Sequence, residues 1–107
     1  MSEKGVGTLV TLKARPGLGD ELLTYLARET RYVSAEEHTP IFLISRSSED
    51  PDTIYLFEAY RDATAQEAHR ANPSTAHVKG GLPPLLAEPP RIVRLHGTTG
   101  KGLFPGM

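Results

Sequence analysis

The 107-residue sequence contains no cysteine and no tryptophan. Without cysteine the chain can form no disulfides, thiolate nucleophiles or thiolate metal sites. An excess of charge of one sign is also missing, because 12 basic residues face 13 acidic ones, for a formal net charge of −1. A nearly neutral chain without a basic cluster is poorly suited to electrostatic binding of nucleic acid. We therefore expect no nucleic-acid partner.

Long apolar runs are missing too. The longest, Ile41 to Ile44, is far shorter than the roughly 20 residues that span a bilayer. The first residues, Met1 to Gly5, lack the apolar core of a signal peptide. These features predict a cytoplasmic protein with no membrane partner.

The composition is uniform along the chain, which predicts a single domain. The end of the sequence differs, because Gly97 to Met107 carries four glycines and a proline. We predict one domain over residues 1–97 and a flexible C-terminal tail or arm over residues 98–107.

Hydrophobic periodicity predicts a small α+β domain of βαββαβ order. Strands are expected over residues 6–14, 41–47, 53–60 and 91–96. A first helix is expected from Asp20 to near Ser34. A second is expected to begin at Thr64, with Glu67 completing a capping box, and to start again at Asn72-Pro73. The short connection over residues 48–52 makes the two middle strands an antiparallel hairpin.

The middle strands are apolar on both faces. In the strand over residues 53–60, Ile54 and Leu56 share one face, and Tyr55 and Phe57 share the other. A sheet that is apolar on both faces has to be covered on both, and two helices can cover only one of them. We therefore expect a homodimer that forms through the open sheet face.

Two polar residues continue the apolar face of the same strand. Glu58 and Tyr60 point the same way as Ile54 and Leu56, because side chains alternate along a strand. Apolar surroundings favour the neutral form of a carboxyl group, which suits a general acid or base near neutral pH. The alternative is structural: Glu58 pairs with an arginine at the sheet end, and Tyr60 simply closes the core.

Two histidines follow in the second helical region. His69 shares a helical stripe with Ala65 and Ala68, which aims it toward the strand carrying Glu58. A neutral imidazole there can take a proton from a phenol or quinol, or it can be a core histidine bonded to Glu58. His77 joins the substrate-binding residues if the Asn72-Pro73 step keeps the helical phase, and lies at the surface otherwise.

Metal chemistry is a weak alternative. Glu58, His69 and His77 have the composition of a two-histidine, one-carboxylate iron site, but their spacing is not distinctive, and we expect no metal and no cofactor. Arg46 and Arg94 stand near strand ends, where arginines are ordinarily solvated and could also meet an anionic substrate.

Several segments together resemble the antibiotic biosynthesis monooxygenase family. They are Ala14 to Gly17, Asp50-Pro51, Phe57 to Asp62, Ala68-His69 to Pro73, and Leu85-Leu86. The resemblance implies a dimeric ferredoxin-like α+β barrel, in which each subunit has an antiparallel four-stranded sheet with helices on one face and a pocket between them. The family often has tryptophan where Tyr60 stands, and its second helix is normally uninterrupted, unlike the segment with Gly80-Gly81 here.

The family resemblance also suggests an activity. Its better-understood members oxidise quinol-like or anthrone-like aromatics with dioxygen and without metal or flavin, while relatives degrade haem or isomerise small keto compounds. We therefore predict a cofactor-independent monooxygenase acting on a small electron-rich aromatic substrate. His69 or Glu58 would deprotonate the substrate, Tyr60 would hydrogen-bond the developing oxyanion, and the pocket would be lined by Leu26, Ile54, Leu56 and His77.

Two other functions remain open. The pocket could hold a hydrophobic small molecule in a non-catalytic dimeric binding or stress-related protein, or the same residues could isomerise a small keto compound. Fold alone does not separate these functions.

Overall fold

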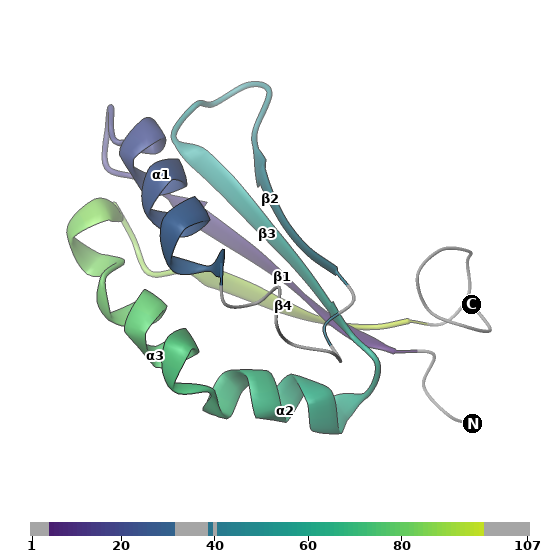
Figure 1. Ribbon diagram of the computed structural model, residues 1–107. Coiled ribbons are helices and arrows are strands. Elements are labelled where there is room, and N and C mark those ends of the chain that lie inside the picture. The colour runs from purple at the N-terminus through teal and green to yellow at the C-terminus, as the bar shows by residue number, and fades with distance from the viewer. Residues whose placement is uncertain (1–4, 32–38, 40, 98–107) are drawn as a thin grey trace.

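The computed structural model describes residues 5–31, 39 and 41–97. Its elements, in chain order, are β1 (Val6–Lys13), α1 (Gly19–Glu29), β2 (Ile41–Arg46), β3 (Thr53–Tyr60), α2 (Ala63–Ala71), α3 (Pro73–Gly80), the 3-10 helix η2 (Pro83–Leu85) and β4 (Arg91–His96). The strands form one antiparallel sheet in the order β2-β3-β1-β4. Figure 1 shows the helices on one face of this sheet. The predicted ferredoxin-like α+β fold is confirmed.

Most element boundaries agree with the sequence pattern, and two helix boundaries do not. α1 ends at Glu29, not near Ser34, which falls outside the described residues. α2 begins earlier than predicted, because the side chain of Asp62 accepts a hydrogen bond from the Ala65 N–H at 2.8 Å. The cap is therefore Asp62 and not Thr64. Asp62 has an extended backbone (φ −160°, ψ 176°), as is usual for the residue that caps a helix.

The break between α2 and α3 was predicted correctly. Asn72 has an extended backbone (φ −65°, ψ 128°), and its side chain accepts a hydrogen bond from the Ser74 N–H at 2.9 Å. Pro73 occupies the start of α3, where its missing N–H costs nothing. The second helical region is therefore two short helices that meet at an angle (Figure 1).

The core lies between the sheet and the helices. It is built from apolar side chains on the inner face of the sheet and the inner stripe of α1, including Leu22, Leu26 and Ile54, which are all 0% exposed. Complete burial of one such side chain contributes about 1.5–3 kcal/mol. α1 is therefore fixed firmly against β3, and its last turn reaches the site described below.

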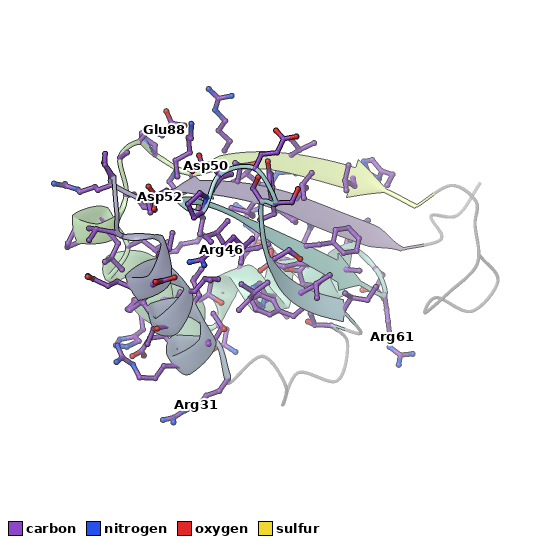
Figure 2. The ribbon with its side chains drawn as sticks, turned by 90° about the horizontal axis from the view of Figure 1, so that it is seen from above. Arg31, Arg46, Asp50, Asp52, Arg61 and Glu88 are labelled. Carbon is purple, nitrogen blue, oxygen red and sulfur yellow. The ribbon has the colours of Figure 1, made fainter. Side chains whose placement is uncertain are left out.

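The start of α1 is attached to the β2–β3 turn. The carboxylate of Asp52 accepts hydrogen bonds from the Gly17 and Gly19 N–H groups, at 3.0 and 2.9 Å. Gly17 has a φ of 82°, in the left-handed region that favours glycine. Figure 2 shows Asp50 and Asp52 together on this turn, near the start of α1. These contacts set where α1 crosses the sheet.

The opposite face of the sheet is apolar, and none of the described helices covers it. Tyr55, Leu43, Val93 and Leu95 are between 37% and 53% exposed there. They come from β2, β3 and β4, with β2 paired directly to β3 and with β1 between β3 and β4. The part of the chain that the structure describes contains no helix that is both long and apolar enough to cross a membrane.

Candidate functional site

A cavity of about 800 Å³ lies between the helices and the inner face of the sheet. Its floor comes from the strands, its walls from the end of α1 and from α2 and α3, and its far side from the segment between η2 and β4. Apolar side chains provide most of this lining, among them Val10, Leu12, Leu26, Phe42, Leu56 and Val78. Such an enclosure with a few polar groups is typical of a small-molecule site.

The polar part of the floor is one row of residues across the sheet. Phe42, Glu58, Thr8 and Arg94 are neighbours in strand register, running from β2 through β3 and β1 to β4. All four line the cavity. Because paired residues in an antiparallel sheet project to the same face, this row presents an aromatic ring, a carboxyl group, a hydroxyl group and a guanidinium side by side.

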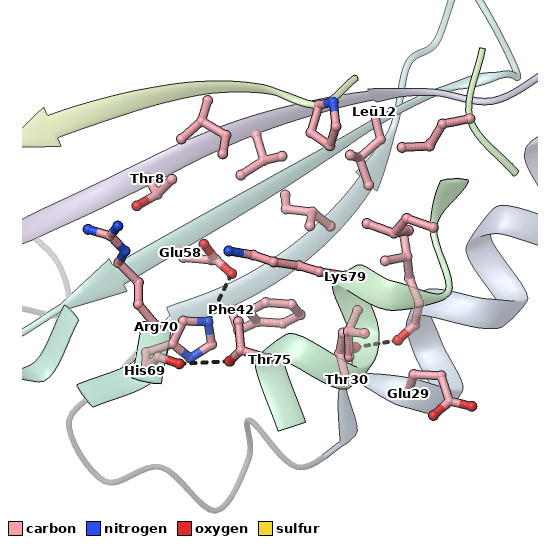
Figure 3. A pocket seen from close by; sticks show the side chains of 18 of the residues that line it. Thr8, Leu12, Glu29, Thr30, Phe42, Glu58, His69, Arg70, Thr75 and Lys79 are labelled. Atoms are coloured by element: carbon pink, nitrogen blue, oxygen red, sulfur yellow. Dashed lines mark hydrogen bonds and ion pairs between the residues drawn. The ribbon is translucent and has the colours of Figure 1, made fainter. Parts of the chain in front are cut away.

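Three of the predicted site residues come together beside this row. His69 Nε2 lies 3.5 Å from Glu58 Oε1 (Figure 3). The ring centroids of Tyr60 and His69 are 5.4 Å apart, with the planes tilted by 47°. Glu58 is 9% exposed, His69 8% and Tyr60 1%. A carboxyl group and an imidazole in contact at the edge of an apolar cavity form an acid–base pair.

The backbone around His69 is held by the helix break. The His69 carbonyl accepts hydrogen bonds from the Thr75 hydroxyl at 2.7 Å and from the Asn72 N–H at 3.2 Å (Figure 3). One turn earlier, the Gln66 amide donates to the Thr8 hydroxyl at 3.1 Å. α2 is thus tied to both α3 and β1, which fixes the position of the imidazole over the floor.

The remaining predicted lining residues divide into two groups. Leu26 and Leu56 line the cavity, as the sequence predicted. Ile54 does not, because it lies at the α1 end of β3, where it is 0% exposed within the core. His77 is also outside the lining: its side chain is 66% exposed, and its Nε2 lies 3.0 Å from Glu29 Oε2. This contact joins α3 to the end of α1.

Glu29 itself lines the cavity near this contact. A hydrogen bond from Arg28, at 2.8 Å, is the main cause that holds the pKa of Glu29 below its ordinary value, and His77 adds to the effect. Glu29 is therefore a carboxylate whose charge is already matched by its neighbours at neutral pH.

Several lining residues escaped the sequence analysis: Thr8, Phe42, Gln66, Arg70 and Lys79. Gln66 and Arg70 stand beside His69 on the inner stripe of α2, so the helical period carried a signal for both. Thr8 and Phe42 are near Glu58 only through strand pairing, which local periodicity does not reveal. Within the described ranges, no three histidines or carboxylates gather closely enough to hold a metal ion.

The sequence signature of the family described as antibiotic biosynthesis monooxygenase matches residues 6–79. This match covers most of the chain, and the chain belongs to that family. None of the proteins with curated functions is significantly similar in sequence.

Solved structures agree with this fold across nearly the whole chain. The NE2512 protein of unknown function from Nitrosomonas europaea is 25% identical, with a TM-score of 0.81 over 92% of this chain and 94% of that one. A candidate antibiotic biosynthesis monooxygenase from the same organism is 20% identical, with a TM-score of 0.85 over 95% and 98%. Rv0793 from Mycobacterium tuberculosis is 21% identical, with a TM-score of 0.83 over 92% and 99%.

Proposed function

We propose that this protein is a monooxygenase of small electron-rich aromatics such as hydroquinones, and that it uses dioxygen without a bound cofactor. The observation that supports this most directly is the contact between His69 and Glu58 beside the Tyr60 ring, in a largely apolar cavity. Family membership supports the same class of reaction.

The reaction balances without an external reductant. A hydroquinone and one dioxygen give a hydroxyquinone and one water, so the substrate supplies all the electrons. The residues of this chain need only remove a proton and protect the resulting anion. A phenolate transfers electrons to dioxygen far more readily than the neutral phenol does, which makes proton removal the step to catalyse.

In this proposal His69 accepts the phenolic proton. The imidazolium that forms remains beside the Glu58 carboxylate, which stabilises its charge in a site largely closed to water. The Tyr60 hydroxyl donates a hydrogen bond to the developing oxyanion. The apolar side chains Leu26, Phe42 and Leu56 enclose the aromatic ring of the substrate and admit dioxygen.

The proposed assembly is a homodimer. The open face of the sheet is an exposed hydrophobic patch, which favours association. It consists of Leu43, Tyr55, Val93 and Leu95. A second copy of the same sheet covers this face in a two-fold arrangement. Each subunit retains its own cavity, because the cavity lies on the other side of the sheet.

Oxygen uptake with a panel of substituted hydroquinones tests the proposed activity. We expect uptake of one dioxygen for each hydroquinone consumed, and one labelled oxygen atom in the product when the gas is ¹⁸O₂. Dialysis against EDTA should leave the rate unchanged.

Two different results would support the competing functions instead. Saturable binding of hydroquinones without oxygen uptake would contradict the proposal and support a non-catalytic binding protein. Rearrangement of a keto substrate under anaerobic conditions would contradict it in favour of an isomerase.

A further inference from the structure

The cavity lining contains three carboxylates and three lysine or arginine side chains. Each of its three carboxylates has a basic side chain close by: Glu58 with His69 at 3.5 Å, Glu29 with His77 at 3.0 Å, and Glu88 with Arg91 at 3.9 Å. Among its cations, Lys79 and Arg94 form no ion pair with any residue that the structure describes. Arg70 has one, to the exposed Glu67 at 3.4 Å. Among the described residues, none of the three lysine and arginine side chains of the lining is therefore paired with a carboxylate of the cavity.

Two of these cations flank the same buried hydroxyl. Arg94 pairs with Thr8 in the β1–β4 register, so both side chains project from the same face of the sheet. Arg70 follows Gln66 by one helical turn on α2, and Gln66 donates a hydrogen bond to Thr8. Figure 3 shows the Arg70 side chain pointing toward Thr8. Arg70 and Arg94 thus approach Thr8 from the helix side and from the neighbouring strand.

Thr8 itself retains a hydrogen-bond donor. It is 7% exposed, and its hydroxyl oxygen accepts the bond from Gln66. The hydroxyl hydrogen has no acceptor among residues 5–31, 39 and 41–97. One hydroxyl donor and two guanidinium groups around one end of a cavity are suited to a carboxylate, which accepts several charge-assisted hydrogen bonds at once.

We propose that Thr8, Arg70 and Arg94 form a subsite for a carboxylate carried by the aromatic substrate. This inference deepens the proposed function and rests on the same cavity. Glu58 and Arg94 lie in one row with Thr8 between them, which separates their Cα atoms by about 10 Å at ordinary strand spacing. The substrate is accordingly an aromatic acid, with its hydroxyl group at His69 and its carboxylate at the arginines.

The Glu58 carboxylate makes this orientation the only favourable one. An incoming carboxylate is repelled at Glu58 and attracted at the arginines, whereas a phenolic hydroxyl can donate to the Glu58–His69 pair. The subsite therefore selects the acid over its neutral analogue and also presents the correct end of the ring to the base.

Equilibrium binding of 2-naphthoate and 2-naphthamide tests the subsite without any turnover. The two probes have nearly the same shape and differ in charge. We expect wild-type protein to bind the acid about tenfold more tightly than the amide, with a preference that weakens as salt is added. Arg70→Gln and Arg94→Gln should each reduce the preference about threefold, and the double variant should nearly abolish it.

Arg61→Gln is the matched control. Arg61 is exposed just after β3, outside the cavity lining, and points away from the body of the protein in Figure 2. This variant should keep the full preference. Three results would each overturn the subsite. Wild-type protein could bind the two probes equally well, it could bind neither probe, or the double variant could keep the preference for the acid. So would a loss caused by Lys79→Met alone, because the anion would then bind at α3.

A further variant separates this proposal from the proposed reaction. His69→Ala should lose oxygen uptake and retain the preference for 2-naphthoate, because the imidazole is not part of the subsite. If no hydroquinone supports oxygen uptake while the charge preference follows the arginines, the monooxygenase proposal fails and the carboxylate subsite stands. If oxygen uptake occurs but the protein does not prefer 2-naphthoate over 2-naphthamide, the carboxylate subsite fails and the monooxygenase proposal stands.

Discussion

His69 Nε2 lies 3.5 Å from Glu58 Oε1, which joins the inner stripe of α2 to the middle of β3. Both side chains are less than 10% exposed. The contact is therefore a buried polar pair between a helix and the sheet, and removing either member can also affect stability. Tests of catalysis at these positions need a parallel measurement of folding.

His69→Ala should lower kcat by about 10²–10⁴-fold, the usual cost of losing a positioned base. Oxygen uptake measures the loss, and circular dichroism and the thermal transition show whether the fold is retained. His77→Ala should leave kcat nearly unchanged, because the His77 imidazole contacts Glu29 at the surface, outside the cavity lining. Equal losses in the two variants would contradict the assignment of His69 as the base.

Tyr60→Phe and Glu58→Gln should distinguish the contributions of the two neighbours of His69 to catalysis. Tyr60→Phe keeps the ring and removes one hydrogen bond, so we expect a loss of about tenfold or less. Glu58→Gln removes the carboxylate that would stabilise the imidazolium, so we expect a loss of about 10–10²-fold in kcat. If Glu58→Gln loses more activity than His69→Ala, Glu58 and not His69 is the group that takes the proton.

Gly19→Ala and Gly80→Ala should change stability in opposite directions. A Cβ at Gly19 would lie 2.1 Å from the Pro51 carbonyl oxygen, within the contact that attaches α1 to the β2–β3 turn. We expect a loss of about 1–3 kcal/mol in the free energy of unfolding. A Cβ at Gly80 meets nothing within 4 Å, and Gly80 ends α3, so alanine there should stabilise by about 0.5 kcal/mol. Urea denaturation of both variants measures the difference.

Asp50 should make the fold sensitive to acid. The Thr53 hydroxyl donates to Asp50 at 2.7 Å and the Asp52 N–H at 3.0 Å, and these bonds hold the pKa of Asp50 below its ordinary value of 3.8. A lowered pKa means that the ionised form stabilises the fold. This stability is present above pH 3.8 and is lost as the pH falls through the lower folded-state value. Asp50→Asn should therefore be less stable than wild type at pH 7, and the gap in urea midpoint should narrow below pH 3.8. A gap that stays constant over this range would contradict the assignment.

The sequence predicted the strands more accurately than the helices. β3 and β4 have the predicted bounds, because alternation and a neighbouring turn mark each of them. The start of α2 was ambiguous, since Asp62 and Thr64 are both good capping residues. The structure decides for Asp62, whose backbone is extended and whose carboxylate accepts the hydrogen bond from the Ala65 N–H.

The convergence of Glu58, Tyr60 and His69 followed from two local periods, one of a strand and one of a helix. His77 was placed on the inner stripe by continuing the helical period. The extended backbone at Asn72 resets that phase, so His77 comes to the surface. Arg94 was named only as an arginine near a strand end that could meet an anionic substrate. Thr8 was beyond such reasoning, because its place between Glu58 and Arg94 comes from strand pairing between distant parts of the chain.

Dimerisation is the last prediction, and it follows from the uncovered sheet face. Tyr55 and Val93 are 37% and 52% exposed there, and a second sheet would bury them. Sedimentation equilibrium at micromolar concentration should give about twice the chain mass of 11.7 kDa. Tyr55→Glu combined with Val93→Glu should shift the protein toward monomer, because two charges would be buried without partners. Ala68→Glu, on the exposed side of α2, adds charge away from this face and should remain dimeric. A wild-type protein that sediments as a folded monomer would show that the apolar face needs no second copy.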